Sequence, residues 1–401
     1  MNAVLRSVEE VRAEILAHAR CTSRLEQVPA AAALNRILAE DVVARVDVPP
    51  ADNSAMDGYA LNTLDPAVQE GASLPVSDRI PAGQVGQPLL PGTLARIFTG
   101  ANMPEGSDAV LIQEDTSADG ELVRIDEMPK TGAWVRPRGQ DMAKGAVAIS
   151  AGTQLGPQHL GLMASVGITE VRAFRPLRVA IFSTGDELKD PPEPLGPGQI
   201  YNSNRATLTG LLKMMGLDVF DLGRIADDLA ATEWALSTCA ARADIIITSG
   251  GVSVGEEDYV KQALDNRGRL ETWKVAMKPG KPVAFGFVDE VPFFGLPGNP
   301  VSTYVSFLLF VKPFLLKQQG CLDVLPKSYL ARAGFRIKGG RRREYVRVRQ
   351  IQQADGSLML ELFDNQSSGV LSSLTWAEAL AEIEINTMVE PGDLVPVYPL
   401  L

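Results

Sequence analysis

The chain has 401 residues, of which 45% are hydrophobic, and a formal net charge of −11 at pH 7. This length exceeds one ordinary hydrophobic core and predicts two to four domains. The negative charge makes nucleic acid a poor partner, and two histidines with three scattered cysteines leave little material for a zinc site, a Ser-His-Asp triad or a disulfide framework.

The N-terminal segment is acidic where a signal peptide would carry positive charge before an apolar core. The longest apolar run, residues 301–316, contains Lys312 and Pro313 and is too short to span a bilayer. We therefore expect a cytoplasmic protein with no membrane partner.

The first part of the chain, up to about residue 140, begins with segments that predict ordinary helices and strands. Ser7 and Glu10 form a capping box for a helix that runs to about His18, and residues 30–40 predict a second short helix before a valine-rich strand. Residues 61–140 are rich in Gly, Pro and Val, with short apolar runs between turns. This pattern predicts a small, mostly β domain.

Three polar positions in this part of the chain carry possible function. Asp57 lies in DNSAMDGYA, which predicts an irregular exposed loop, and an Asx-type turn explains the same residues. Thr99 lies in a bend after an apolar strand. Asp141 lies in RPRGQDMAKG, where a solvated charged loop is as good an explanation as a binding loop.

From Arg178 onward, strands and helices alternate in the way that predicts βαβ units and a mostly parallel sheet. Ligands of such sheets bind at the carboxyl edge of the strands. The β-branched run at residues 245–247 is typical of a buried strand, and it leads directly into a turn of small residues. A ligand can approach that backbone closely. The turn contains Ser249, Gly250, Gly251 and Ser253.

Acidic residues follow three of these strands. They are Glu187 in STGDEL, the pair Asp227 and Asp228, and Asp258 in SVGEEDYV. Carboxylates at this edge indicate a divalent cation or a proton-transfer role, because they repel phosphate unless a metal ion lies between. An N-cap of the next helix explains one residue of the Asp pair equally well. The glycine spacing fits neither GxGxxG nor a Walker loop.

The same region supplies positive charge and a rigid turn. Lys274 and Lys278 lie in a stretch broken by Pro279 and Pro282, so we expect them to line a loop that attracts an anionic substrate. Further on, FFGLPGNP predicts a strand that ends in a rigid bend before a long apolar helix. Its backbone N–H groups can serve as anion donors. The bend consists of Pro297, Gly298, Asn299 and Pro300.

After Pro326 the pattern is all β, with an Ala-Asp-Gly hairpin turn at residues 354–356. A separate C-terminal barrel or sandwich follows from this pattern. Five arginines between positions 341 and 349 give it a basic face, which either guides anions or is an ordinary solvated surface.

Several stretches together resemble the MoeA-type molybdopterin molybdotransferases, a family also represented by the C-terminal domain of gephyrin. These stretches are DNSAMDGYA, IFTGANMPEGSDAV, STGDEL, GQIYNSN, SGGVSVGEEDYV, MKPGKP and GLPGNPVS. The resemblance implies a multidomain α/β plus β protein with a central, mostly parallel α/β molybdopterin-binding domain. The implied domains are a discontinuous linker domain (1–50 and 141–175), a β-rich second domain (51–140), the α/β domain (176–326) and a C-terminal β-barrel (327–401).

The resemblance also implies a reaction. Such proteins insert molybdate into adenylylated molybdopterin with release of AMP, aided by Mg²⁺, and yield molybdenum cofactor. They are homodimers whose active site lies between the α/β domain of one chain and the second domain of the other. Further implied partners are the molybdopterin adenylyltransferase and the recipient molybdoenzymes. The alternatives are an adenylyltransferase with the same α/β domain, a gephyrin-like scaffold and a catalytically silent paralogue.

Residue roles follow from the matching motifs. The implied catalytic residues are Asp57, Asp141, Glu187, Asp227, Asp228 and Asp258, with Glu187 and Asp258 as metal ligands. The implied substrate-binding residues are Thr99, Ser249, Gly250, Gly251, Ser253, Lys274, Lys278, Pro297, Gly298, Asn299, Pro300, Ser367 and Ser368. Trp376 and Glu378 depart from the family pattern, because small residues and Asn are commoner there.

Overall fold

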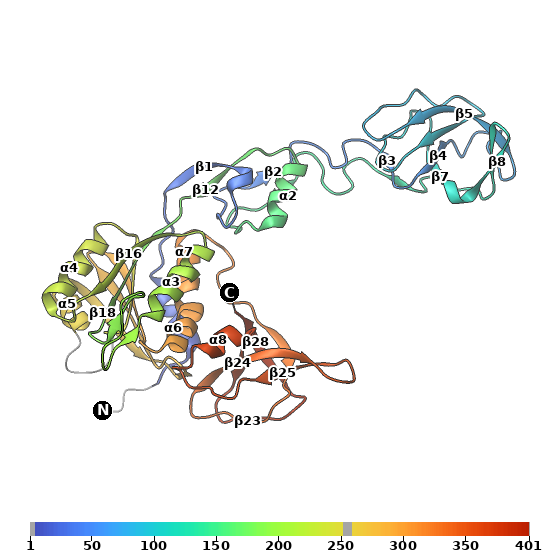
Figure 1. Cartoon of the computed structure of the whole chain (residues 1–401). Coiled ribbons are helices and arrows are strands. Elements are labelled where there is room, and N and C mark those ends of the chain that lie inside the picture. The colour runs from blue at the N-terminus through green and yellow to red at the C-terminus, as the bar shows by residue number, and fades with distance from the viewer. Residues whose placement is uncertain (1–4, 252–258, 401) are drawn as a thin grey trace.

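The computed structural model describes residues 5–251 and 259–400, which fold into four units along an extended chain (Figure 1). A β-rich unit lies at one end, a linker unit lies next to it, and an α/β unit and a C-terminal β unit lie side by side at the other end. The linker unit therefore separates the β-rich unit from the α/β unit within one chain.

A six-stranded sheet forms the centre of the α/β unit. Four strands are parallel, and the last two pair antiparallel. The sheet is thus mostly parallel, as the alternating pattern predicts. Its order is β16 (Asp218–Ile225), β13 (Arg178–Thr184), β17 (Ile245–Ser249), β21 (Val291–Leu296), β20 (Pro282–Val288) and β18 (Gly268–Lys274).

Both faces of this sheet are buried under helices. In β17, Ile245 and Ile247 point into one core and Ile246 points into the other, because successive side chains of a strand alternate. All three isoleucines are fully buried, which confirms the predicted buried strand. One face carries α4 (Leu229–Ala240) and α5 (Tyr259–Arg267), and the other carries α3 (Ser203–Met214) and the helix of residues 300–318.

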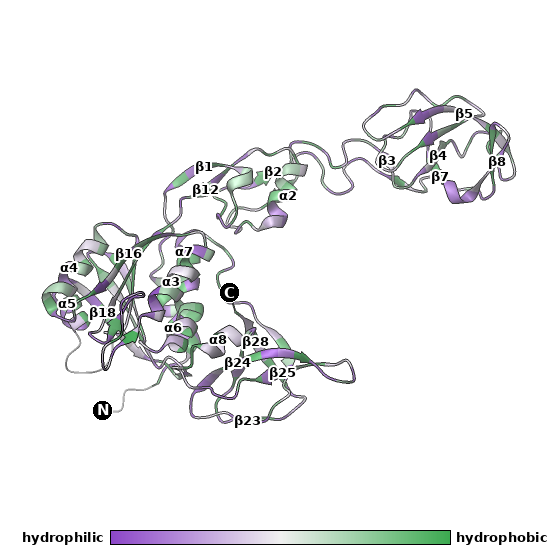
Figure 2. Ribbon diagram, in the orientation of Figure 1, coloured by the Kyte–Doolittle hydropathy of each residue, from purple (hydrophilic) through white to green (hydrophobic). Residues whose placement is uncertain are grey.

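The long apolar helix comprises α6 (Pro300–Ser306), a π-helical turn (Phe307–Val311) and α7 (Lys312–Gln318). It is long and apolar enough to cross a membrane by length and composition, but 83% of its most apolar window is buried inside the protein. Its hydrophobic residues belong to the same buried core as the sheet and the N-terminal helix, and Figure 2 shows green, hydrophobic stretches along the ribbon of this helix. Burial of this kind is typical of a core helix.

The N-terminal helix α1 (Val8–Ala17) packs on the α/β unit. Val8, Val11 and Ile15 are buried in the same core as Phe314 of α7. The predicted capping box is confirmed, since the Ser7 side chain accepts from Glu10 N–H and the Glu10 side chain accepts from Ser7 N–H. Although α1 lies in the range expected for the linker domain, its contacts tie it to the α/β core.

The linker unit contains α2 (Pro157–Ser165) and two short antiparallel pairs. These pairs are β1 (Leu25–Pro29) with β12 (Glu170–Phe174), and β2 (Val42–Val43) with β11 (Val147–Ile149). The helix predicted over residues 30–40 is wrong apart from one 3-10 turn (Ala30–Ala32). Beyond that turn, the N–H groups of Leu38 and Ala39 bond to Thr153 and Arg172, so tertiary pairing replaces the helical bonds.

The β-rich unit contains a six-stranded sheet, which agrees with the predicted mostly β domain. A short pair at its base, β3 (Asn53–Ser54) with β10 (Val135–Arg136), joins it to the linker. The strand order is β7 (Ala109–Ile112), β4 (Gly58–Leu61), β6 (Leu94–Ile97), β5 (Ser73–Ile80), β9 (Leu122–Ile125) and β8 (Thr116–Asp119).

The C-terminal unit is built on β24 (Arg343–Gln352), which forms the predicted hairpin with β25 (Leu358–Leu362). Its sheet runs β19 (Met277–Lys278), β24, β26 (Ala379–Ile383), β28 (Leu394–Pro399) and β22 (Tyr329–Arg332). An isolated bridge between Ala333 and Leu360 brings β25 beside the end of β22.

Lys274 is the last residue of β18, where it pairs with Pro282, so it does not lie in the predicted loop. Two further side chains lie differently from the prediction. Lys278 belongs to a short strand, β19 (Met277–Lys278), which pairs in parallel with β24, so it does not lie in a free loop. Arg347, predicted on the basic face, is only 1% exposed. Its guanidinium donates to Ser373 Oγ and to the carbonyls of Asn365 and Ser367. Both outcomes depend on contacts between segments far apart in sequence.

Candidate functional site

The carboxyl ends of β13 and β17 meet at one edge of the sheet, where Thr184 and Ser249 end neighbouring parallel strands. Gly250 and Gly251 follow with φ of +87° and +65°. A Cβ atom at Gly251 would lie 2.6 Å from Thr184 Oγ1 and 2.9 Å from Val260 Cγ2. This turn therefore requires glycine both for its conformation and for its space.

Two neighbouring cavities open at this edge. The first, of about 600 Å³, is the strand-edge cavity, and the second, of about 660 Å³, is the lysine cavity. They share Gly250, Gly298 and Asn299 and therefore adjoin. The strand-edge cavity is lined by residues that include Thr184, Glu187, Asn202, Asn204, Ser249 and Pro300. The lysine cavity is lined by residues that include Gly251, Lys278, Lys281, Pro297, Arg342, Ser367 and Ser368.

Positive charge gathers in the lysine cavity. Lys278 and Lys281 are exposed, and Lys278 Nζ lies 2.9 Å from Glu344 Oε2. Arg342 donates to the Met277 carbonyl at 3.1 Å, which fixes its side chain beside Lys278. Lys274 ends β18 and is not among the residues that line either cavity. The structure therefore places Lys278 with the predicted substrate residues and leaves Lys274 aside.

The C-terminal unit completes the wall of the lysine cavity. Val301 N–H donates to the Ser368 carbonyl at 3.1 Å, so the serine loop is tied to the first turn of α6. The buried Arg347 holds the same loop through the Asn365 and Ser367 carbonyls. Ser367 and Ser368 thus share the wall of this cavity with Pro297, Gly298 and Asn299.

Two asparagines in the strand-edge cavity leave buried polar atoms unsatisfied. Asn202 Oδ1 accepts from Arg205 N–H at 3.2 Å, and Asn204 Nδ2 donates to the Gly298 carbonyl at 2.7 Å. Within the described residues, Asn202 Nδ2 and Asn204 Oδ1 have no partner. Burial of such an atom costs about 1–3 kcal/mol. Both residues belong to the motif GQIYNSN, but their unpaired burial emerges only in the fold.

The acidic residues divide into three groups. Glu187 is exposed on the turn after β13 and lines the strand-edge cavity. Asp228 caps α4 by accepting from Ala231 N–H at 2.8 Å, which bears out the N-cap explanation, and Asp227 is exposed beside it. Ser253 and Asp258 lie outside the described residues. Among residues 5–251 and 259–400, no group of three or more His, Cys, Asp or Glu side chains is arranged to hold a metal ion.

Asp57, Thr99 and Asp141 lie away from this edge within the chain. Asp57 and Thr99 belong to the β-rich unit, where two hydrogen bonds from Thr99 lower the pKa of Asp57. Asp141 lies where the linker meets that unit, and its N–H donates to the Val48 carbonyl. Because the linker unit separates the β-rich unit from the α/β unit, one chain does not bring these residues to Glu187 (Figure 1).

The cavities lie at the carboxyl edge of a mostly parallel α/β sheet, which is where such domains bind their ligands. Residues 180–317 match the family described as a probable molybdopterin binding domain. Residues 6–167 match the MoeA N-terminal region (domain I and II), and residues 331–400 match the MoeA C-terminal region (domain IV). The chain belongs to the MoeA family.

Individual relatives agree with this membership. The chain is 43% identical over 316 residues to the molybdopterin molybdenumtransferase of Haemophilus influenzae, and the match covers 78% of each chain. It is 38% identical over 382 residues to the molybdopterin molybdenumtransferase of a Nostoc species, and this match covers 92% of the chain and 87% of the relative. A solved structure of the molybdopterin biosynthesis MoeA protein from Pyrococcus horikoshii superposes with a TM-score of 0.81 at 27% identity, covering 99% of this chain and all of that one.

Proposed function

We propose that the protein is a molybdopterin molybdotransferase, which inserts molybdate into adenylylated molybdopterin and releases AMP. The observation that carries this proposal is the pair of adjoining cavities at the carboxyl edge of the sheet, with lysines in one and Glu187 in the other. The relatives with this name are similar over most of the chain. Matches on both sides of the α/β domain favour this activity over an adenylyltransferase that needs that domain alone.

The lysine cavity suits the anionic parts of the reaction. Lys278, Lys281 and Arg342 supply cationic donors, and charge-assisted hydrogen bonds to phosphate or oxyanion oxygens are the strong kind. The Gly298 and Asn299 backbone lies at the start of α6, where the helix dipole favours an anion. In this proposal these groups bind the phosphoanhydride and molybdate and orient them for AMP release.

Glu187 and Asp258 are the proposed ligands of Mg²⁺. Oxygen donors are the ligands that this ion prefers, and the exposed carboxylate of Glu187 on the cavity wall fits that preference. When bound, Mg²⁺ supplies charge neutralisation on the phosphoanhydride. Ser249 and the glycine turn lie beside Glu187 and leave room for the nucleotide part of the substrate.

We infer that the active site is completed in a homodimer. Asp57, Thr99 and Asp141 lie on units that the linker holds away from Glu187, so a partner chain is needed to bring equivalent residues to the cavity. A closed symmetric dimer forms two such composite sites. The proposal further includes a cytoplasmic location. It places the protein between the adenylyltransferase, which supplies the substrate, and the molybdoenzymes, which receive the product. The C-terminal unit is proposed to be a barrel that closes near Ala333 and Leu360.

The test is to incubate the protein with adenylylated molybdopterin, Mg²⁺ and molybdate, and to measure AMP and active cofactor. We expect Glu187→Gln, Lys278→Met and Asp57→Asn each to lower both yields. Full activity in all three variants would refute the site.

A mixing experiment tests the composite site. Glu187→Gln and Asp57→Asn chains are each expected to have strongly lowered activity alone. Random exchange of the two chains should restore about a quarter of the wild-type sites, since half of the dimers are mixed and each has one intact site. A mixture that stays inactive after confirmed subunit exchange would show that each site lies within one chain.

A further inference from the structure

A third cavity, of about 640 Å³, lies at the junction of the linker, α/β and C-terminal units. We call it the junction cavity. It shares no lining residue with the strand-edge or lysine cavity. Its walls come from the first turn of α2, from α7 with the segment after it, and from the end of β28. This volume is in the range of small-molecule sites.

The junction cavity has an apolar body. Leu308 and Leu316 are buried at 2% and 4% exposure, and they form its inner wall. Leu322 and Leu325 also line it, yet these side chains remain 80% and 51% exposed. When a ligand covers apolar side chains on an open wall and removes them from water, the free energy of the system falls.

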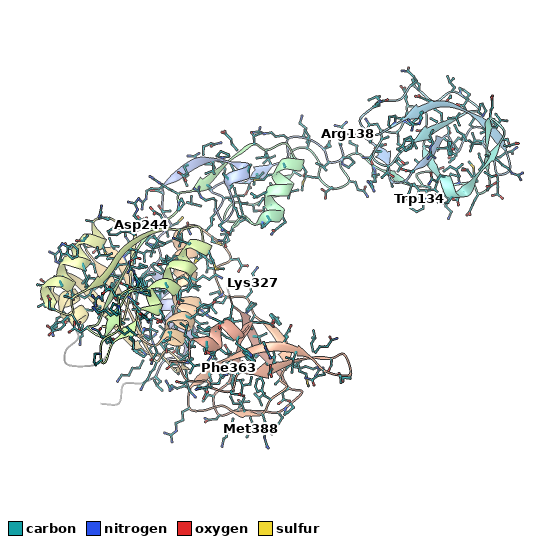
Figure 3. The ribbon with its side chains drawn as sticks, in the orientation of Figure 1. Trp134, Arg138, Asp244, Lys327, Phe363 and Met388 are labelled. Carbon is teal, nitrogen blue, oxygen red and sulfur yellow. The ribbon has the colours of Figure 1, made fainter. Side chains whose placement is uncertain are left out.

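Lys312 is the cation of this apolar space that has no partner among the described residues. Lys312 begins α7 and is partly buried, and the burial lowers the pKa of its ammonium. Within residues 5–251 and 259–400 the Lys312 side chain has no hydrogen-bond acceptor and no ion-pair partner. The other charged residues of the lining compensate one another, because Lys327 Nζ lies 2.8 Å from Asp323 Oδ2. Lys327 lies between the α/β and C-terminal units (Figure 3).

His159 adds a further polar side chain to the lining of the cavity. Its Nδ1 accepts from Gly156 N–H at 2.8 Å, so the neutral imidazole carries its proton on Nε2. Within the described residues, the Nε2–H group of His159 has no hydrogen-bond acceptor. The tautomer is therefore set by the backbone of α2, and the free N–H belongs to a residue of the cavity wall.

We propose that the junction cavity binds a monocarboxylate with an apolar chain. The carboxylate pairs with Lys312 and accepts from His159, and the chain covers the leucine wall. A carboxylate carries the single charge that one ammonium balances. Phosphate dianions are better suited to clusters of cations and backbone N–H groups, such as those of the lysine cavity. This site is separate from the proposed molybdenum insertion site.

Binding is tested by calorimetric titration of the full-length protein with decanoate below its micelle concentration. We expect saturable binding of one decanoate per chain, with decanol at least about tenfold weaker because it lacks the charge. Lys312→Met should weaken decanoate binding by about tenfold or more, and Lys312→Arg should retain most of it. Unsaturable binding, or equal affinity for decanol, would overturn the proposal.

Matched variants separate this site from others. The double variant Asp323→Asn/Lys327→Met removes both members of the ion pair in the same cavity without changing its net charge, and should leave the affinity unchanged. Glu187→Gln alters only the proposed catalytic site, and should also bind decanoate normally. If Lys312→Met has wild-type affinity, or if Asp323→Asn/Lys327→Met loses as much affinity as Lys312→Met, the assignment of Lys312 is wrong.

Discussion

Thr99 donates both its backbone N–H and its hydroxyl to the same carboxylate oxygen of Asp57, at 2.8 and 2.7 Å. These two bonds favour the ionised carboxylate and hold the pKa of Asp57 below its ordinary value. Thr99→Val removes one of them and should raise the pKa of Asp57, whereas Thr99→Ser should preserve it. An NMR titration of the Asp57 carboxyl carbon measures both variants.

The same contact predicts the direction of a pH effect. The pKa of Asp57 is lower in the folded than in the unfolded chain, so its stabilisation is complete above the unfolded value and is lost as pH falls through the folded value. The difference in thermal midpoint between wild type and Thr99→Val should therefore shrink at strongly acidic pH. An unchanged difference would show that ionised Asp57 does not stabilise the fold.

Lys278 is predicted to bind substrate by its charge. Lys278→Met removes a charge-assisted hydrogen bond worth about 1.5–3 kcal/mol and should weaken binding of adenylylated molybdopterin about ten- to hundredfold. Glu344→Gln is the control, because it removes the present partner of Lys278 and leaves the lysine in place. Equilibrium binding measures both, and a loss in Glu344→Gln equal to that in Lys278→Met would contradict this role.

Asp228 is predicted to act in stability, as the cap of α4. Asp228→Ala should destabilise the protein by about 0.5–2 kcal/mol, and Asp228→Asn should have little effect because an amide oxygen also caps. Thermal unfolding gives the comparison, with AMP release as the second measurement. If Asp228→Asn abolishes AMP release while the thermal midpoint is kept, the carboxylate has a role in the site.

Gly280 and Gly298 form a matched pair in the wall of the lysine cavity. Gly280 has φ of +99°, and a Cβ there would lie 2.8 Å from Met277 Cε and 2.9 Å from Ser306 Oγ. Gly280→Ala should cost more than about 1 kcal/mol. Around Gly298 no atom lies within 4 Å of a Cβ, so Gly298→Ala should cost less than about 1 kcal/mol. Equal decreases in the thermal midpoint of unfolding for Gly280→Ala and Gly298→Ala would contradict this expectation.

Much of the α/β unit could be predicted because it is encoded by short, local sequence patterns. The run of residues 245–247 is buried on both faces, and this burial explains its unbroken hydrophobicity. Parallel strands present their carboxyl ends at one edge, so the turns that carry Glu187 and Gly250 had to approach each other. The capping box at Ser7 and the hairpin at residues 354–356 are likewise short-range patterns.

Long-range contacts decided the rest. Lys278 entered a strand because β24 supplies its partner, and Arg347 became buried because carbonyls from residues 365 and 367 satisfy its donors. The unpaired atoms of Asn202 and Asn204, and the walls of the junction cavity, also come from segments far apart in sequence. No local pattern reports such burial.

The sequence by itself determined the order of elements, the mostly parallel sheet and the edge at which polar residues gather, since these follow from hydrophobic periodicity and from turn chemistry. Only the tertiary structure decided which candidates meet. It placed Glu187 and Lys278 on adjoining cavities, assigned Asp228 to a helix cap and held Asp57 at the far end of the linker. The physical reason is that packing joins surfaces from distant segments, and their pairing depends on the whole chain.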